Sequence, residues 1–137
     1  MTAEISSKPI EGGCHCGALR FAVAGAVVRT VVCHCRSCQR SLGAAFAVFA
    51  NVAASDFRYT RGAPLLYRST TDVQREFCGA CGTQLVFRRD GAARIGVNAA
   101  TLDDSAQVKP DLHIWTQSDI GWFDTTDTAP RHKQSPW

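Results

Sequence analysis

The spacing of seven cysteines constrains this chain more strongly than any other feature of its sequence. They form a first pair (Cys14 and Cys16), a three-cysteine cluster (Cys33, Cys35 and Cys38) and a second pair (Cys78 and Cys81). The N-terminal residues 1–8 contain no apolar signal core, so we expect a cytoplasmic protein. The cytosol keeps thiols reduced, and clustered cysteines there usually bind metal or take part in catalysis rather than form disulfides. The sequence therefore predicts metal binding.

Each cluster has a spacing that suits metal ligands. Residues i and i+2 of an extended segment point to the same side, so Cys14 and Cys16 can face one metal. The three-cysteine cluster begins with the same spacing, and a turn would then bring Cys38 back towards the other two. The second pair has the sequence of a zinc knuckle, in which small residues let backbone N–H groups approach the thiolates. One such motif is a weak signal, whereas three in one chain are a strong one.

Seven ligands divide naturally into four and three. A closed structural zinc site takes four protein ligands, whereas a catalytic site typically takes three and leaves one position open. The three-cysteine cluster is a self-contained chelate, so we predict that Cys33, Cys35 and Cys38 hold an open, catalytic zinc. The first and second pairs would then form a closed structural zinc site that joins the start of the chain to its middle. Spacing alone also allows other divisions.

The hydrophobic pattern predicts a mainly β fold in a single domain. Leu19, Phe21 and Val23 alternate with residues that suit a solvent-facing side, as in a half-buried strand. Asp90-Gly91 is a favourable hairpin turn. We expect one helical turn over residues 38–43, and a polar C-terminal stretch, 124–137, that either drapes over the domain or frays. The predicted strands cover residues 19–23, 27–32, 46–49, 65–68, 73–77, 83–87, 93–97 and 113–115.

Charge and hydropathy argue against a nucleic-acid or membrane partner. No apolar run approaches the roughly 18 residues of a membrane span. The formal charge of +3 overstates the basic character, because seven deprotonated thiols and two bound Zn²⁺ would together remove three positive charges. The longest basic run is Arg88-Arg89, and a nucleic-acid interface would need a basic patch or arm.

Other polar residues near the cysteines have alternative roles. His15 and His34 lie between cysteines, and strand alternation turns them away from a metal. His113 lies in an apolar run and is expected to be a buried structural residue. Ser37 could donate a hydrogen bond to a sulfur. The residues for which we weigh a pocket or substrate role against ordinary surface or packing roles are Arg36, Gln39, Arg40, Trp115 and Trp122.

The cysteine motifs and their flanking residues resemble those of the glutathione-dependent formaldehyde-activating enzyme family, also called the centromere protein V-like domain. The resemblance rests on Gly13–Gly17, Cys33–Arg40 with Gly43–Phe46, and Arg75–Thr83, and residues 99–104 and 110–115 extend it. It spans roughly residues 11–136. It implies a β-tent of small antiparallel sheets around a structural zinc site, with residues 1–10 as an N-terminal extension and 11–137 as the zinc-binding domain. It also implies the four-plus-three division of two zinc ions per chain.

The resemblance further implies condensation of glutathione with formaldehyde to S-hydroxymethylglutathione, a carbon–sulfur lyase activity. A zinc with three thiolates has a net charge of −1, so it suits a substrate thiol better than activated water. A free thiol with a pKa of about 8.5 is only about 3% thiolate at pH 7, so coordination raises that fraction. The substrates expected are therefore glutathione or a similar thiol and a small aldehyde. The alternative is a non-catalytic zinc module that binds a thiol metabolite or a protein partner.

Overall fold

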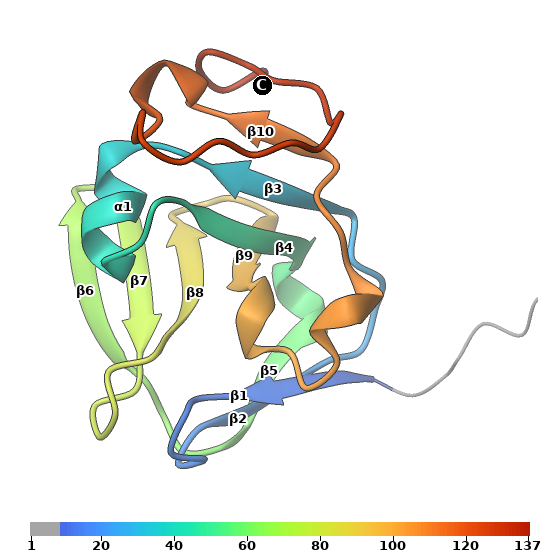
Figure 1. Cartoon of the computed structure of the whole chain (residues 1–137). Helices are drawn as coiled ribbons and strands as arrows, with labels where there is room; N and C mark the ends of the chain where they lie inside the picture. The colour runs from blue at the N-terminus through green and yellow to red at the C-terminus, as the bar shows by residue number, and fades with distance from the viewer. Residues whose placement is uncertain (1–8) are drawn as a thin grey trace, which may run out of the picture.

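The computed structural model describes residues 9–137, and its main elements are β-strands in two sheets (Figure 1). The smaller sheet contains β1 (Ile10–Gly13), β2 (Arg20–Val23) and β5 (Phe57–Arg61) in the order β1-β2-β5. Both strand pairs in it are antiparallel. The predicted fold class, mainly β, is confirmed.

The larger sheet has seven strands in the order β10-β3-β4-β9-β8-β7-β6. Its pairs are antiparallel except β10 with β3, which is parallel. The strands are β3 (Arg29–Cys33), β4 (Ala47–Ala53), β6 (Leu65–Thr70), β7 (Val73–Phe77), β8 (Gln84–Arg89), β9 (Arg94–Asn98) and β10 (Leu112–Ile114).

The helical elements are short. The α-helix α1 (Arg36–Leu42) follows β3, and Gly43 ends it in the left-handed conformation that glycine adopts without strain. The part of the chain that the structure describes also contains four 3₁₀ turns: η1 (Ala54–Asp56), η2 (Ala99–Thr101), η3 (Ser105–Gln107) and η4 (Thr116–Ser118). Within residues 9–137, the helices are all too short to cross a membrane.

The main core lies between the two sheets. Phe21 and Val23 from β2 pack in one cluster with Leu85, Ile95 and Val97 from the larger sheet, and each of these side chains is at most 2% exposed. Burying such side chains contributes roughly 1.5–3 kcal/mol each to folding. Cys14 and Cys78 belong to the same cluster, so the first and second pairs of cysteines adjoin the core.

The C-terminal segment drapes over the domain beside β10, one of the two predicted outcomes (Figure 1). The His113 backbone donates to the carbonyl of Pro130 at 2.8 Å, and the His132 backbone donates to the carbonyl of His113 at 2.9 Å. The His113 ring, 1% exposed, lies 2.8 Å from the Asp127 carboxylate. These contacts hold the segment against the edge of the larger sheet.

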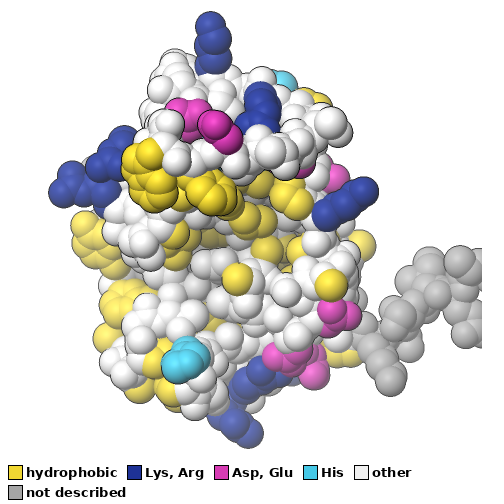
Figure 2. All heavy atoms as spheres, viewed as in Figure 1, with side chains coloured by type: hydrophobic (Ala, Val, Ile, Leu, Met, Phe, Trp, Pro, Cys, Tyr) yellow, Lys and Arg dark blue, Asp and Glu magenta, His cyan; other side chains and the backbone are white. Residues whose placement is uncertain are grey.

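The face drawn in Figure 2 carries hydrophobic side chains across its middle, below the layer formed by β10 and the C-terminal segment. Lysines and arginines on this face lie at its edges and within its upper layer, and they do not gather into one patch.

Candidate metal centres and adjoining pocket

The first and second pairs of cysteines come together where the two sheets meet. The first pair follows β1, in a turn closed by a 3.2 Å hydrogen bond from the Gly17 N–H to the Cys14 carbonyl. The second pair follows β7, in a turn closed by a 2.8 Å bond from the Gly82 N–H to the Cys78 carbonyl. Both glycines have φ of +81°, a conformation that favours glycine. Two similar turns therefore present four sulfurs to one point, which we call the four-cysteine cluster.

The geometry of the four-cysteine cluster fits a tetrahedral metal. The Cys16 sulfur lies 3.7 Å from that of Cys14 and 3.8 Å from that of Cys78. A zinc ion with four sulfurs at about 2.3 Å has tetrahedral edges of about 3.8 Å. All four sulfurs lie within 4.8 Å of one another. The cluster can therefore hold a metal ion, although Cys14 and Cys16 meet through a turn and not through the extended segment that their spacing suggests.

Hydrogen bonds favour the thiolate forms of Cys14 and Cys81, whereas the pKa of Cys16 in the same cluster is raised to about 11. Hydrogen bonding to the Thr83 side chain, 3.3 Å away, lowers the pKa of Cys81 to about 5. The Leu19 N–H donates to the Cys14 sulfur at 3.2 Å. The Thr83 hydroxyl also accepts from the His15 backbone at 3.1 Å, so Thr83 links the two turns. His15 itself is exposed and is not part of the cluster.

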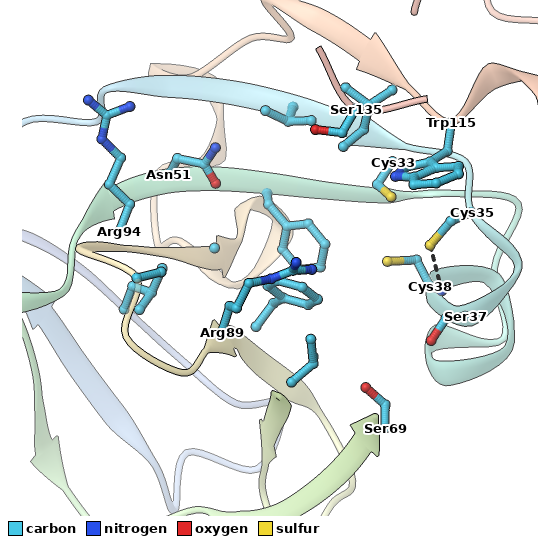
Figure 3. A pocket seen from close by; sticks show the side chains of 18 of the residues that line it. Cys33, Cys35, Ser37, Cys38, Asn51, Ser69, Arg89, Arg94, Trp115 and Ser135 are labelled. Carbon is cyan, nitrogen blue, oxygen red and sulfur yellow. Dashed lines mark hydrogen bonds between the residues drawn. The ribbon is translucent and has the colours of Figure 1, made fainter. Parts of the chain in front are cut away.

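The three-cysteine cluster forms where β3 passes into α1. Cys33 is the last residue of β3, Cys35 caps the helix, and Cys38 lies in its first turn. The capping sulfur of Cys35 accepts a 3.3 Å hydrogen bond from the Cys38 backbone, drawn as a dashed line in Figure 3. The three sulfurs lie within 4.8 Å of one another. They can also hold a metal, and the structure groups the seven cysteines as four and three.

The three sulfurs differ in their preference for the proton. Hydrogen bonds from the Cys33 and Cys38 thiols lower the pKa of Cys35 to about 2. The same bond with Cys35 raises the pKa of Cys33. Among the three cysteines, Cys35 therefore most favours the thiolate form, and it is also the most exposed.

The three-cysteine cluster lies at one end of a cavity of about 1070 Å³. Figure 3 shows Cys33, Cys35 and Cys38 beside Trp115 at this end, while Asn51 and Arg94 lie at the opposite end. Apolar side chains of the larger sheet, such as Phe49 and Phe87, line the space between, and their rings pack 5.7 Å apart. The four-cysteine cluster does not line this cavity. The three-cysteine cluster thus borders a space large enough for a small-molecule ligand, and the four-cysteine cluster does not border that space.

The end of the cavity away from the cysteines is basic. Arg29 pairs with Asn51 across β3 and β4, and its Nε is buried without a hydrogen-bond partner among the described residues. Burial and the nearby Arg94 both lower the pKa of Arg29. Within residues 9–137 neither arginine forms an ion pair. The Arg29 guanidinium stacks on the Trp137 ring at 3.6 Å, so this end presents cations beside an aromatic wall.

Arg75 is a site residue that the sequence analysis missed. It lies on β7, is 2% exposed, and places both terminal guanidinium nitrogens 3.7 Å from the Cys38 sulfur. It also donates to the hydroxyls of Ser37 at 3.1 Å and Ser69 at 3.2 Å. The sequence did contain a signal that Arg75 is buried, because the alternation of β7 puts it on the same side as the apolar Val73. The Ser37 hydroxyl, which the sequence suggested as a possible donor to a sulfur, accepts from this arginine.

The remaining residues near the three-cysteine cluster have mostly structural contacts. Gln39 is buried and its amide donates to the carbonyls of His34 and Ser118 at 2.7 and 2.8 Å, so it ties α1 to η4. The buried His34 ring lies 2.8 Å from the His113 ring and takes no part in either cluster. Arg36 and Trp115 line the large cavity.

Two further residues line a smaller, shallower hollow. Arg40 and Trp122 lie there beside Arg36, and Trp122 is 75% exposed. Neither lines the large cavity, so they are not placed to contact a ligand of the three-cysteine cluster.

Comparison with known proteins agrees with this geometry. The model of the family named glutathione-dependent formaldehyde-activating enzyme matches residues 9–118. A crystal structure of a protein from Rhodobacter sphaeroides is similar with a TM-score of 0.59 and 32% sequence identity, over 69% of this chain and 89% of that one. The matched region includes all seven cysteines. The chain belongs to the glutathione-dependent formaldehyde-activating enzyme family.

Proposed function

We propose that this protein is a zinc-dependent enzyme of the carbon–sulfur lyase type. It joins glutathione, or a similar thiol, to formaldehyde or another small aldehyde and yields an S-hydroxymethyl adduct. The observation that carries the proposal is the position of the three-cysteine cluster, which opens onto one end of a cavity of about 1070 Å³. Family membership supports the same chemistry. We place this activity in a domain of residues 11–137 and in the cytoplasm.

The two clusters are proposed to hold two zinc ions with different roles. Cys14, Cys16, Cys78 and Cys81 would bind a structural zinc, since four sulfurs close its coordination. Cys33, Cys35 and Cys38 would bind a second zinc and leave one position towards the cavity. When bound there, zinc favours the thiolate form of a substrate thiol. The three cysteines supply thiolate ligands, and soft ligands of this kind suit a further sulfur better than water.

The rest of the cavity would bind and orient the thiol. Glutathione carries two carboxylates, and Arg29 and Arg94 supply cations without ion-pair partners among residues 9–137. The apolar side chains of Phe49 and Phe87 line the middle of the cavity and would make it less favourable for water than its two ends. With the substrate held at both ends, its sulfur would lie beside the three-cysteine cluster.

The reaction joins two molecules without oxidation or reduction. The thiol loses its proton, its sulfur forms a bond to the aldehyde carbon, and the carbonyl π electrons move to oxygen. That oxygen takes up one proton, which gives the hydroxymethyl group. Full conversion of the thiol to thiolate would raise the reaction rate by at most about 30-fold at pH 7. The cavity must therefore contribute mainly by positioning the two reactants.

Calorimetry with glutathione and S-methylglutathione tests whether the sulfur is the group recognised. We expect glutathione to bind with release of about one proton near pH 7, because its free thiol is mostly protonated there. Titrations in two buffers of different ionisation enthalpy count that proton. The S-methyl compound, which cannot form a thiolate, should bind at least tenfold more weakly, roughly the loss of one charge-assisted contact.

A turnover assay then separates an enzyme from a binding module. NMR exchange with ¹³C-formaldehyde measures how fast the S-hydroxymethyl adduct forms with and without protein. The C35A variant should lose the acceleration, and R40Q, altered at an exposed residue of the same helix, should keep it. Thiol-dependent binding without acceleration would favour a non-catalytic module, and equal binding of the S-methyl compound would contradict thiol recognition itself.

A further inference from the structure

Arg75 has an environment that a structural arginine rarely has. Its side chain is 2% exposed, its guanidinium lies 5.2 Å from the centre of the Phe87 ring, and its other partners are the hydroxyls of Ser37 and Ser69. No carboxylate among residues 9–137 forms an ion pair with it. The one partner that can carry negative charge is the Cys38 sulfur, 3.7 Å from both terminal nitrogens.

The neighbouring residue on β7 shows the contrast. Glu76 is also buried, but it faces Arg88 at 2.7 Å and the Tyr59 hydroxyl at 2.9 Å. Its charge is therefore paired locally. An arginine stays charged in a protein, and a buried charge is costly unless an opposite charge compensates it. For Arg75 the compensating charge has to come from the three-cysteine cluster.

We propose that Arg75 is the positioning residue that balances the charge of the three-cysteine site and so lets it accept an anionic fourth ligand. Three thiolates and one Zn²⁺ have a net charge of −1, and the Arg75 guanidinium brings the whole to zero. A substrate thiolate then enters a neutral site instead of a negative one. The two terminal nitrogens of Arg75 also fix the Cys38 sulfur from the side of β7. The Cys35 sulfur is held instead by the backbone N–H of Cys38 in α1. This inference rests on the metal proposed for the three-cysteine cluster. It concerns the preference of that metal site for an anionic over a neutral fourth ligand.

Cobalt-substituted protein offers a test that does not depend on turnover. Thiolate-bound Co²⁺ absorbs visible light, and its spectrum reports each change of the fourth ligand. We would titrate 2-mercaptoethanol, which binds as an anion, and imidazole, which binds as a neutral molecule. The variants are R75Q and R75M, which remove the charge, R75K, which keeps it, and R58Q, which alters an exposed arginine that does not line the cavity.

The expected result is a loss that depends on the charge of the ligand. R75Q and R75M should weaken 2-mercaptoethanol binding by about tenfold or more, because one nearby positive charge is gone. Imidazole binding should change by less than about threefold, since a neutral ligand gains little from that charge. R75K should retain thiol binding to within about threefold, and R58Q should resemble the unaltered protein.

Several results would overturn the inference. Equal weakening of both ligands, or a loss in R75K as large as in R75Q, would show that Arg75 acts through packing and not charge. Failure of both neutral variants to keep cobalt in the four-cysteine cluster would assign Arg75 a structural role. If the unaltered protein binds only one cobalt, the proposed open site falls together with this inference. If two cobalt ions bind and the variants leave thiol binding unchanged, only the inference about Arg75 falls.

Discussion

Cys35 and Cys81 belong to different clusters but are alike in burial, since each is partly exposed. They therefore separate the two proposed metal roles better than the fully buried cysteines do. Cys81 completes a group of four sulfurs that joins the turns after β1 and β7, so its loss would open the proposed closed site. Cys35 caps α1 and faces the cavity, so its loss affects a site that already has an open side.

The C81A and C35A variants should differ clearly in stability. Structural zinc contributes on the order of 10 kcal/mol to folding of small zinc domains, so C81A should lose several kcal/mol of it. C35A removes the cap of α1 and should lower the free energy of unfolding by about 1 kcal/mol. Denaturant unfolding of both variants, purified under reducing conditions, measures the difference. A larger loss in C35A than in C81A would mean that the structural and open sites are assigned the wrong way round.

The strand β1 carries the first pair of cysteines to the rest of their cluster, and it does so through a close backbone approach. A Cβ at Gly12 would collide with the Thr101 carbonyl oxygen and the Phe21 ring. Gly12 also pairs with Leu102 in an isolated bridge. Because Cys14 follows two residues later, any shift of β1 moves the first pair relative to the second.

The G12A variant should therefore weaken both the fold and the four-cysteine cluster. Overpacking of this kind costs about 1–3 kcal/mol, and the displaced turn should release its metal to a chelator faster. G43A is the matched control. It places alanine at a φ of +61° with open space around its Cβ. This change should lower the free energy of unfolding by about 1 kcal/mol without affecting the four-cysteine cluster. Unchanged metal release in G12A would show that β1 does not position Cys14.

Sequence patterns predicted the strands that have a clear period or a buried β-branched run. The predicted segment 73–77 coincides with β7, and the Asp90-Gly91 turn joins β8 to β9 with Gly91 at φ of +73°. The strands β1 and β5 were missed. Ile10–Gly13 contains two glycines and one apolar residue, so it has no strong local signal. Phe57–Arg61 is an edge strand beside β2, and its alternation rests on only two aromatic residues, Phe57 and Tyr59.

The site shows the same division between local and long-range information. The three-cysteine cluster could be predicted because its members lie within six residues of one another. Arg75 could not, because its contact with Cys38 joins residues 37 positions apart on different elements. The cations at the far end of the cavity are likewise brought there by the order of strands in the larger sheet.

At the scale of the whole molecule, the two clusters occupy different positions in the architecture. The four-cysteine cluster adjoins the main core and joins the smaller sheet to the larger one, whereas the three-cysteine cluster belongs to a separate small core beside α1. The position of the four-cysteine cluster suits a metal that stabilises the fold. The three-cysteine cluster lies at the end of a cavity, where a bound metal could exchange a ligand.

Metal analysis of the unaltered protein and two variants tests this division most directly. Elemental analysis under reducing conditions should give two zinc ions per chain for the unaltered protein and one for C35A. Mild chelation should remove one zinc first from the unaltered protein, because a site with three ligands holds metal less tightly than one with four. C81A should lose the zinc that resists chelation. One zinc or none in the unaltered protein, with all seven thiols still free, would contradict the account, as would two zinc ions retained by C35A.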